Sequence, residues 1–357
     1  MKFYSYTNID KTDAVYKMII GERSNGKTYG ALKKIVENYY AKRKQGALIR
    51  RWDEDLKGKR GQAMFESLVS NDEITKITHG MWTGVYYYSG RWYLCRYEDD
   101  NRITDDTPFC YGFSLSAMEH DKSTSYPDIT TVVFDEFLSR TSYLPDEFVL
   151  FCNVLSTIIR HRTDVIIYML GNTVNKYCPY FNEMGLKHVK DMEQGTIDVY
   201  SYGKDGKLKV AVEYCKPFAK GKPSDFYFNF DNSALKMITG GAWEIAVYPH
   251  LPVKYKPKDV LYRFYISFDG ENLQCNVIHI QKSTFIYIHR KTTPLKNESS
   301  DLIFSPEYCH TPNWRRKINK PYDKIGNKIA ELFKKDKVFY SSNEVGEIVR
   351  NYLLWCG

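Results

Sequence analysis

Four residues in the stretch Met18–Gly30 have the types and spacing of a phosphate-binding loop. Gly21, Gly26, Lys27 and Thr28 satisfy the pattern G-x-x-x-x-G-K-[ST]. In such a loop the glycines let successive backbone N–H groups point at phosphates, and the positive end of the following helix adds to their field. The lysine reaches the β- and γ-phosphates, and the threonine hydroxyl is a ligand for Mg²⁺. We therefore expect a site for ATP and Mg²⁺ formed by Gly21, Glu22, Arg23, Ser24, Asn25, Gly26, Lys27 and Thr28.

A pair of acidic residues follows an apolar, β-branched run of the kind found in buried strands. The run Thr130–Phe134 ends in Asp135 and Glu136. Asp135 would hold the Mg²⁺ through a water molecule, and Glu136 would polarise an attacking water. An exposed acidic strand end is the alternative, which the accompanying phosphate loop disfavours. The acid beside the metal carboxylate also favours hydrolysis over phosphoryl transfer to a small acceptor.

Asn172 follows a third apolar run, Val165–Leu170. A continuous apolar run is typical of a parallel strand that is covered on both faces. The C-terminal end of this strand is expected beside that of the Asp135 strand. Asn172 would then contact the γ-phosphate or the attacking water, and a simple polar end to the strand is the alternative.

Two basic residues are expected at the opposite edge of this sheet. Arg160 lies at the end of a helix expected over about 145–160, and such a crossover helix runs antiparallel to its strands. Lys122 precedes the Asp135 strand and falls near the same edge. Both could reach a neighbouring subunit's ATP in a head-to-tail ring, where an arginine stabilises transition-state charge. Alternatively, Arg160 and Arg162 cap the C-terminus of their own helix, where cations are favoured.

The elements around the loop are those that a phosphate site requires. The run 15–20 predicts a short buried strand, and 28–44 predicts a helix with one apolar face. The motif binds phosphate when its glycine loop connects a strand to a helix, and this is the arrangement predicted here.

The length and composition of the chain limit the classes of protein to which it can belong. A length of 357 residues suggests two domains, and a net charge of +8 permits a polyanionic partner without demanding one. The eight scattered cysteines contain no C-x-x-C pair, so reduced thiols in a cytoplasm fit better than disulfides or a zinc site. No apolar run reaches the length of a membrane span.

Five stretches carry a resemblance to a known family: "IIGERSNGKTYG", "ALIRRW", "KSTSYPDITTVVFDEF", "LSTIIRHR" and "LGNTVNKYCPYF". In their order and spacing they resemble the DNA-packaging ATPases of small Picovirinae-type tailed bacteriophages. The likeness is good over 1–185 and faint beyond. It implies an α/β P-loop fold of the additional-strand, catalytic-glutamate (ASCE) class with a mostly parallel sheet. It also implies a homomeric ring, pentameric in this family, that drives double-stranded DNA into a preformed capsid at the portal vertex.

The resemblance assigns roles to individual residues. The Walker A and Walker B roles fall on the loop and acidic residues already named. Arg160 is implied as the arginine acting in trans and Lys122 as its partner. A further basic residue that the family places after the "RRW" stretch is absent here, because that position is Asp53 and the nearest lysine is Lys57.

The pattern of expected strands and helices changes in the second half of the chain. We expect a P-loop ATPase domain over 1–185, a linker or lid region with hairpin strands over 186–235, and a smaller α+β domain over 236–357. The resemblance implies that the last domain is RNase H-like and has lost nuclease activity. The sequence agrees on one point, since its strand interiors carry no clustered carboxylates of the kind a two-metal nuclease needs.

Within the last domain, strands and then helices are expected. The runs from Tyr262 onward predict three antiparallel strands, with Asp269 and Gly270 in a hairpin turn. Helices are expected over about 323–335 and 342–354.

Lys57, Lys59 and Arg60 are candidate DNA contacts in the glycine-flanked loop "DLKGKRG", together with basic residues of the C-terminal domain. A translocase must hold any sequence, so it should grip phosphates rather than bases. The tyrosine-rich stretch 81–100 favours two strands around Ser89-Gly90 with a packed aromatic face over a stacking platform for bases.

The leading hypothesis is a ring translocase on double-stranded DNA. It would act in the host cytoplasm while transiently attached to the portal of the procapsid. The alternatives are another P-loop nucleic-acid motor, such as a helicase or DNA pump, then a small-molecule P-loop kinase, and finally a scaffold that only binds nucleotide.

Overall fold

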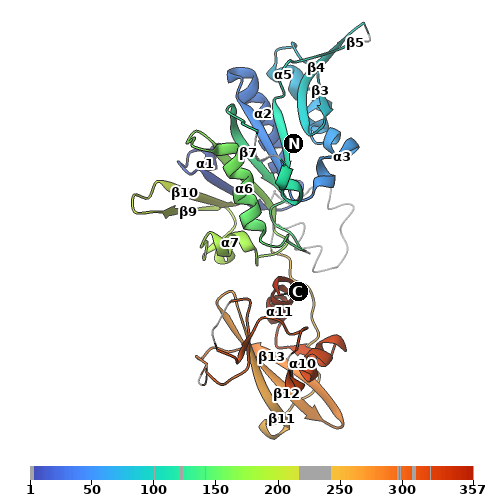
Figure 1. Cartoon of the computed structure of the whole chain (residues 1–357), viewed down its shortest axis with the longest axis vertical. Coiled ribbons are helices and arrows are strands. Elements are labelled where there is room, and N and C mark those ends of the chain that lie inside the picture. Colours follow the sequence, from blue (N-terminus) through green and yellow to red (C-terminus); the bar gives the residue numbers. More distant parts are fainter. Residues whose placement is uncertain are drawn as a thin grey trace. The chain divides into compact units, whose positions relative to one another are not determined.

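The computed structural model describes residues 4–99, 101–120, 124–140, 142–216, 243–295, 297, 299–307, 311–321 and 323–356. These residues form two compact units that divide between Trp243 and Glu244 (Figure 1). No helix among them has the length and apolar character needed to cross a membrane.

A mostly parallel sheet of ten described strands forms the centre of the first unit. The strands are β1 Tyr16–Gly21, β2 Gln45–Arg50, β3 Gly84–Tyr88, β4 Arg91–Glu98, β5 Asn101–Thr104, β6 Cys110–Ser114, β7 Ile129–Asp135, β8 Ile166–Asn172, β9 Thr196–Tyr202 and β10 Leu208–Tyr214. Six of them are parallel neighbours in the order β6–β2–β7–β8–β1–β10. β9 extends one side antiparallel, and β4 with β3 and β5 extends the other.

Helices cover both faces of this sheet. They are α1 Thr7–Asp10, α2 Lys27–Lys42, α3 Gly58–Ala63, α4 Glu66–Ser70, α5 Glu73–Ile77, α6 Glu147–Ile159 and α7 Pro179–Glu183. Successive residues of β1 alternate between two cores, so that Ile20 faces the core that holds Phe151 of α6, and Ile19 faces the one that holds Leu32 of α2. The strands are apolar on both sides because each side is buried.

The parallel register brings the polar strand ends together at one edge of the sheet. Gly21 at the end of β1 pairs with Asn172 at the end of β8, and Asp135 at the end of β7 pairs with Leu170. Residues that lie more than a hundred positions apart in the sequence therefore meet where β1 turns into α2.

The described residues of the second unit form a six-stranded sheet with two α-helices. This unit contains β11 Val260–Phe268, β12 Glu271–Ile280, β13 Ser283–Arg290, β14 Ile303–Phe304, β15 Trp314–Arg315, β16 Val338–Tyr340, α10 Lys324–Lys334 and α11 Asn343–Trp355. The strand order is β15–β14–β11–β12–β13–β16. Asp269 and Gly270 join β11 to β12 with positive φ angles of 55° and 79°, as expected for a tight hairpin. The three antiparallel strands and both helices expected from the sequence are confirmed.

The structure differs from the sequence expectations in two places. The segment around Lys59, expected as a loop, contains the short helix α3. Its Gly61 lies so close to its neighbours that a Cβ would be 2.6 Å from the Leu56 carbonyl oxygen and from the Tyr87 ring, so the glycine serves close packing. The segment 186–235 contains β9 and β10, which pair into the main sheet, so that sheet extends beyond residue 185.

Candidate nucleotide site

The glycine loop lies between β1 and α2, as the motif requires. β1 ends at Gly21, and α2 begins at Lys27. Ser24 and Gly26 have positive φ angles of 59° and 86°, and this left-handed backbone curls the loop over the start of the helix. The N–H groups of a helix N-terminus have no partner within the helix, which makes this end suited to an anion.

Lys27 is buried within this loop, with 5% of its surface exposed. Its Nζ donates to the Glu22 carbonyl oxygen at 2.7 Å, to Asn25 Oδ1 at 3.0 Å and to Asn172 Oδ1 at 3.3 Å. Burial lowers the pKa of Lys27 to about 8, because a buried ammonium has lost its water. A phosphate would supply the missing negative charge, so the lysine fits such a ligand.

The side chains of Thr28 and Asp135, the two predicted Mg²⁺ ligands, are in contact. The Thr28 hydroxyl donates to Asp135 Oδ1 at 2.9 Å. Burial raises the pKa of Asp135, while the nearby Arg50 cation and the Thr28 hydrogen bond act in the opposite direction. A hydroxyl beside a buried carboxylate provides the oxygen ligands that Mg²⁺ prefers.

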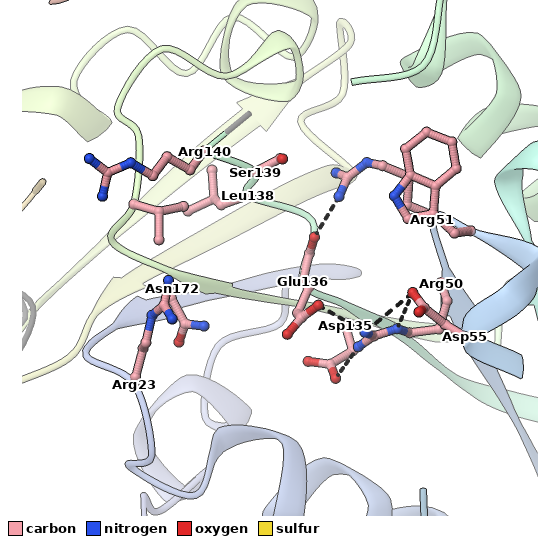
Figure 2. A pocket seen from close by; sticks show the side chains of 12 residues that line it. Arg23, Arg50, Arg51, Asp55, Asp135, Glu136, Leu138, Ser139, Arg140 and Asn172 are labelled. Carbon is pink, nitrogen blue, oxygen red and sulfur yellow. Dashed lines mark hydrogen bonds and ion pairs between the residues drawn. The ribbon is translucent and has the colours of Figure 1, made fainter. Parts of the chain in front are cut away.

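Glu136 follows β7 in a left-handed conformation, with φ of 59°. Its side chain is 59% exposed, and its Oε2 accepts from Arg50 Nη2 at 2.8 Å. Arg50 Nη1 donates to Asp135 Oδ2, also at 2.8 Å. Figure 2 shows this guanidinium between the two carboxylates. Since L-residues rarely adopt positive φ, the turn at Glu136 must be held by its surroundings.

Arg51, the residue after Arg50, binds the backbone of the turn at Glu136. Its Nη1 donates to the Glu136 carbonyl oxygen at 3.1 Å and its Nη2 to the Phe137 carbonyl oxygen at 2.8 Å. Its Nε and Nη2 also donate to the two carboxylate oxygens of Glu147, at 2.7 Å and 2.9 Å. The backbone after β7 is thus tied to the first residue of α6.

Several of these side chains, but not Lys27 or Thr28, line a polar pocket of about 240 Å³. It is lined by Arg23, Arg50, Arg51, Trp52, Asp55, Asp135, Glu136, Leu138, Ser139, Arg140, Asn172 and Val174. The lining combines cations, which suit phosphate oxygens, with carboxylates, which suit a divalent metal. The residues present therefore fit ATP with Mg²⁺.

The predicted trans residues lie elsewhere. Arg160 follows the last residue of α6, and its Nη2 donates to the Thr124 carbonyl oxygen at 2.9 Å. Thr124 precedes β7, whereas Asp135 ends it, so Arg160 lies at the edge opposite the glycine loop. Arg162 donates to the Ile158 carbonyl oxygen at 3.0 Å, and this residue caps the helix end. Lys122 lies outside the described residues.

The predicted DNA contacts form an exposed group on and beside α3. Lys57, Lys59 and Arg60 are all exposed. Lys57 forms an ion pair with Asp53, and Arg60 Nη1 lies 3.9 Å from Asp55 Oδ1. Acidic neighbours therefore offset part of the positive charge of this segment.

Sequence reasoning assigned no role to Arg50, Arg51 or Arg140, although all three line the pocket. The sequence does contain a feature that could have marked Arg50 and Arg51. They directly follow the apolar run of β2, and paired cations at the end of a buried strand are unusual. Nothing in the local sequence marks Arg140.

Comparisons with known proteins identify the family of this chain. A profile of the Podovirus DNA encapsidation protein (Gp16) family matches residues 1–201. The DNA packaging protein of Bacillus phage B103 is 28% identical over 177 residues, which are 49% of this chain and 49% of that protein. The DNA packaging protein of Bacillus phage phi29 is 25% identical over 182 residues, which are 50% of this chain and 49% of that protein. The chain thus spans about half the length of the curated relatives it matches.

Two solved structures share the fold. A chain of the bacteriophage Phi-29 viral genome packaging motor assembly is 17% identical, covers 100% of both chains and has a TM-score of 0.57. A chain of the Phi-28 gp11 DNA packaging motor is 18% identical, covers 99% of this chain and 98% of that one, and has a TM-score of 0.51. Because the family profile matches more than half of its 357 residues, the chain belongs to the Podovirus DNA encapsidation protein (Gp16) family, and the resemblance drawn from its motifs is confirmed.

Proposed function

We propose that this protein is an ATPase that drives double-stranded DNA into a preformed phage capsid. It would work as a homomeric ring of five subunits docked at the portal, in the host cytoplasm. The observation that carries the proposal is the meeting of Lys27, Thr28, Asp135 and Glu136 at one sheet edge, in a chain of the encapsidation family.

Each residue has a separate task in hydrolysis. Lys27 and the loop N–H groups bind the phosphates, and Thr28 and Asp135 would hold Mg²⁺, which supplies positive charge to the phosphate oxygens. Glu136 accepts the proton of the attacking water. Asn172, which already contacts Lys27 Nζ, is placed to orient the γ-phosphate or that water.

The fold supports two finer assignments. A sheet in which β7 lies between β2 and β8, with Glu136 directly after it, suits the ASCE class. In the second unit, three antiparallel strands extended by the parallel β14 and β15 suit an RNase H-like domain. We further propose, as the family resemblance implies, that this domain has lost nuclease activity.

ATP turnover with and without double-stranded DNA, alongside packaging into capsids, tests the proposal. We expect DNA-stimulated hydrolysis and packaging, both lost in Glu136→Gln, which should still bind ATP but turn it over at least about 10²-fold more slowly. Glu54→Gln, an exposed neighbour outside the pocket, serves as the control. DNA stimulation without packaging would favour a helicase or DNA pump. Phosphorylation of a small acceptor would favour a kinase, and binding without turnover a scaffold.

DNA binding is proposed to be electrostatic and to include Lys57, Lys59 and Arg60, with basic residues of the second unit. The exposure of these three side chains supports this. DNA-stimulated turnover should then fall steeply with salt and depend little on DNA sequence. Replacing Lys59 and Arg60 with glutamine should reduce the slope against salt, whereas Lys207→Gln, an exposed lysine paired with Asp205, should not.

A further inference from the structure

The buried ion pair between Arg51 and Glu147 connects two parts of the first unit. Arg51 is 7% exposed and Glu147 is 2% exposed. Besides the two Arg51 bonds, the Glu147 carboxylate accepts from the Tyr180 hydroxyl at 2.9 Å and from the Leu144 N–H at 2.8 Å. Four donors on one carboxylate make this a fully satisfied network, in contrast to the solvent-exposed ion pairs of the chain.

Stability alone does not account for such a pair. Two charges removed from water lose their hydration, and packed apolar side chains of similar volume usually stabilise a core as well. The Arg51 guanidinium has a second use, however. It donates to the carbonyl oxygens of Glu136 and Phe137, the two residues that turn away from β7. A planar fork with five donors can hold Glu147 and both carbonyl groups at once, which a lysine cannot do.

The turn that Arg51 stabilises contains Glu136, the proposed general base, and sets the direction of its side chain. Glu136 has a φ of 59°, so its backbone needs support from outside. Arg51 grips the carbonyl group of Glu136 while Arg50 binds its carboxylate, as Figure 2 shows. The side chain direction of Glu136 is therefore set by two adjacent arginines that come from the end of β2.

We propose that Arg51, held by Glu147, is a positioning residue that fixes Glu136 for hydrolysis and ties it to the N-terminal end of α6. This inference rests on the proposed ATPase function. It follows that loss of Arg51 acts on turnover through Glu136 and leaves the glycine loop intact. Since Arg160 directly follows α6, the same pair connects the site of one subunit to the residue proposed to serve its neighbour.

The test compares Arg51→Gln with wild type in nucleotide binding and single-turnover hydrolysis. We expect nucleotide affinity to stay within about threefold, while the hydrolysis rate falls about 10²-fold, the loss typical of a misplaced catalytic group. Arg51→Lys keeps the positive charge but lacks the planar guanidinium with its five donors. Its hydrolysis rate should lie between those of wild type and Arg51→Gln. Glu147→Gln should lower the rate in the same way, and it replaces Arg51→Gln if that variant fails to fold.

Arg43→Gln is the matched control, because Arg43 also forms a two-point ion pair, with Asp105 at 2.7 Å and 2.9 Å, at the far end of α2. It should leave the hydrolysis rate near that of wild type. A double-mutant cycle then separates positioning from general stability. In a Glu136→Gln background, Arg51→Gln should cost almost nothing further, because the group it positions is already gone.

Four results would overturn the inference. These are a rate for Arg51→Gln within twofold of wild type, a parallel loss of affinity and rate, an equal loss in Arg43→Gln, or full additivity with Glu136→Gln. Each of them would leave the proposed function standing if wild-type protein hydrolyses ATP. Absence of hydrolysis in the wild type would overturn the proposed function and this inference with it.

Discussion

Arg50 and Glu136 form an ion pair in which Nη2 donates to Oε2 at 2.8 Å. The same guanidinium donates to Asp135 at 2.8 Å, so one cation offsets part of the negative charge of both the proposed metal carboxylate and the proposed general base. Without it, two adjacent carboxylates would repel each other in a partly buried pocket.

The first prediction concerns this shared cation. In Arg50→Gln the Asp135 carboxyl loses the charge that opposes the effect of burial, so its pKa should rise further. A group that must be ionised to hold Mg²⁺ then becomes protonated at a higher pH. The acid limb of kcat/KM against pH should therefore move to higher pH, and the ratio of activity at pH 6 to that at pH 8 should fall.

A pH series on Lys207→Gln provides the comparison. Lys207 is also a paired cation, but it is exposed and its partner is Asp205, outside the pocket. Its profile should match that of wild type. An unmoved acid limb in Arg50→Gln would mean that Asp135 does not govern it.

The second prediction concerns Lys27, whose pKa burial lowers to about 8. Below pH 8 the ammonium is already protonated and ready for phosphate, so ATP affinity should be nearly independent of pH there. Above pH 8 the protein must take up a proton in order to bind, and the affinity should weaken by up to about tenfold per pH unit. Calorimetry in two buffers of different ionisation enthalpy measures this uptake directly.

Lys27→Arg is the control, since a guanidinium stays charged throughout this range. Whatever its absolute affinity, that variant should bind ATP without proton uptake at pH 8–9. Equal uptake in both proteins would assign the titration to another group.

Much of this arrangement could be predicted from the sequence, because the information is local. The glycine loop, the strand before it and Asp135-Glu136 after an apolar run each lie within a dozen residues. Parallel strand ends then bring Asn172 to the same edge without further assumptions. The two domains were expected from the chain length and from the change of pattern in the second half of the chain, and the mostly parallel sheet was expected from the family resemblance.

The arginines were missed because their partners are distant in sequence. Arg50 meets Glu136, and Arg51 meets Glu147, only because β2 is the neighbour of β7, and no local pattern states the order of strands in a sheet. The helix α3 was missed for a related reason. Two glycines at 58 and 61 favour a loop, yet the Gly61 carbonyl accepts from Trp92 Nε1 at 2.8 Å, so a tertiary contact stabilises the turn.

The third prediction concerns Gly30, one turn into α2. A Cβ at this position would lie 2.7 Å from the Tyr6 ring, whose hydroxyl donates to the Lys27 carbonyl oxygen at 2.5 Å. Gly30→Ala should therefore displace Tyr6 and cost about 1–3 kcal/mol of unfolding free energy, as overpacking does. It should also weaken ATP binding by loosening the start of the helix.

Chemical denaturation of a double-mutant cycle checks the mechanism. Tyr6→Leu makes room for the new methyl group, so Gly30→Ala should cost much less in that background than in the wild type. Equal costs in both backgrounds would show that Tyr6 is not the residue displaced.

The fourth prediction concerns Arg160, whose guanidinium is bound to the Thr124 carbonyl oxygen at the edge away from the glycine loop. In a head-to-tail ring this edge would face the next subunit's ATP. Removing an arginine that stabilises transition-state charge typically costs 10³–10⁵ in turnover. Arg160→Ala should therefore bind ATP yet fail to hydrolyse it. Arg162→Ala, which removes hydrogen bonds to the carbonyl oxygens of Tyr126, Pro127 and Ile158 at the same edge, should keep most of the activity.

Mixing Arg160→Ala with Glu136→Gln protein distinguishes action in trans from action in cis. Some interfaces of a mixed ring pair an intact Glu136 with an intact Arg160 from the neighbour, so hydrolysis should recover above that of either variant alone. If Arg160 served its own site, every subunit in the mixture would lack one of the two groups, and no combination could create a complete site. In rings shown by native mass measurement to contain both variants, the absence of any recovery would therefore remove the trans assignment. It would also remove the residue that most directly argues for a ring.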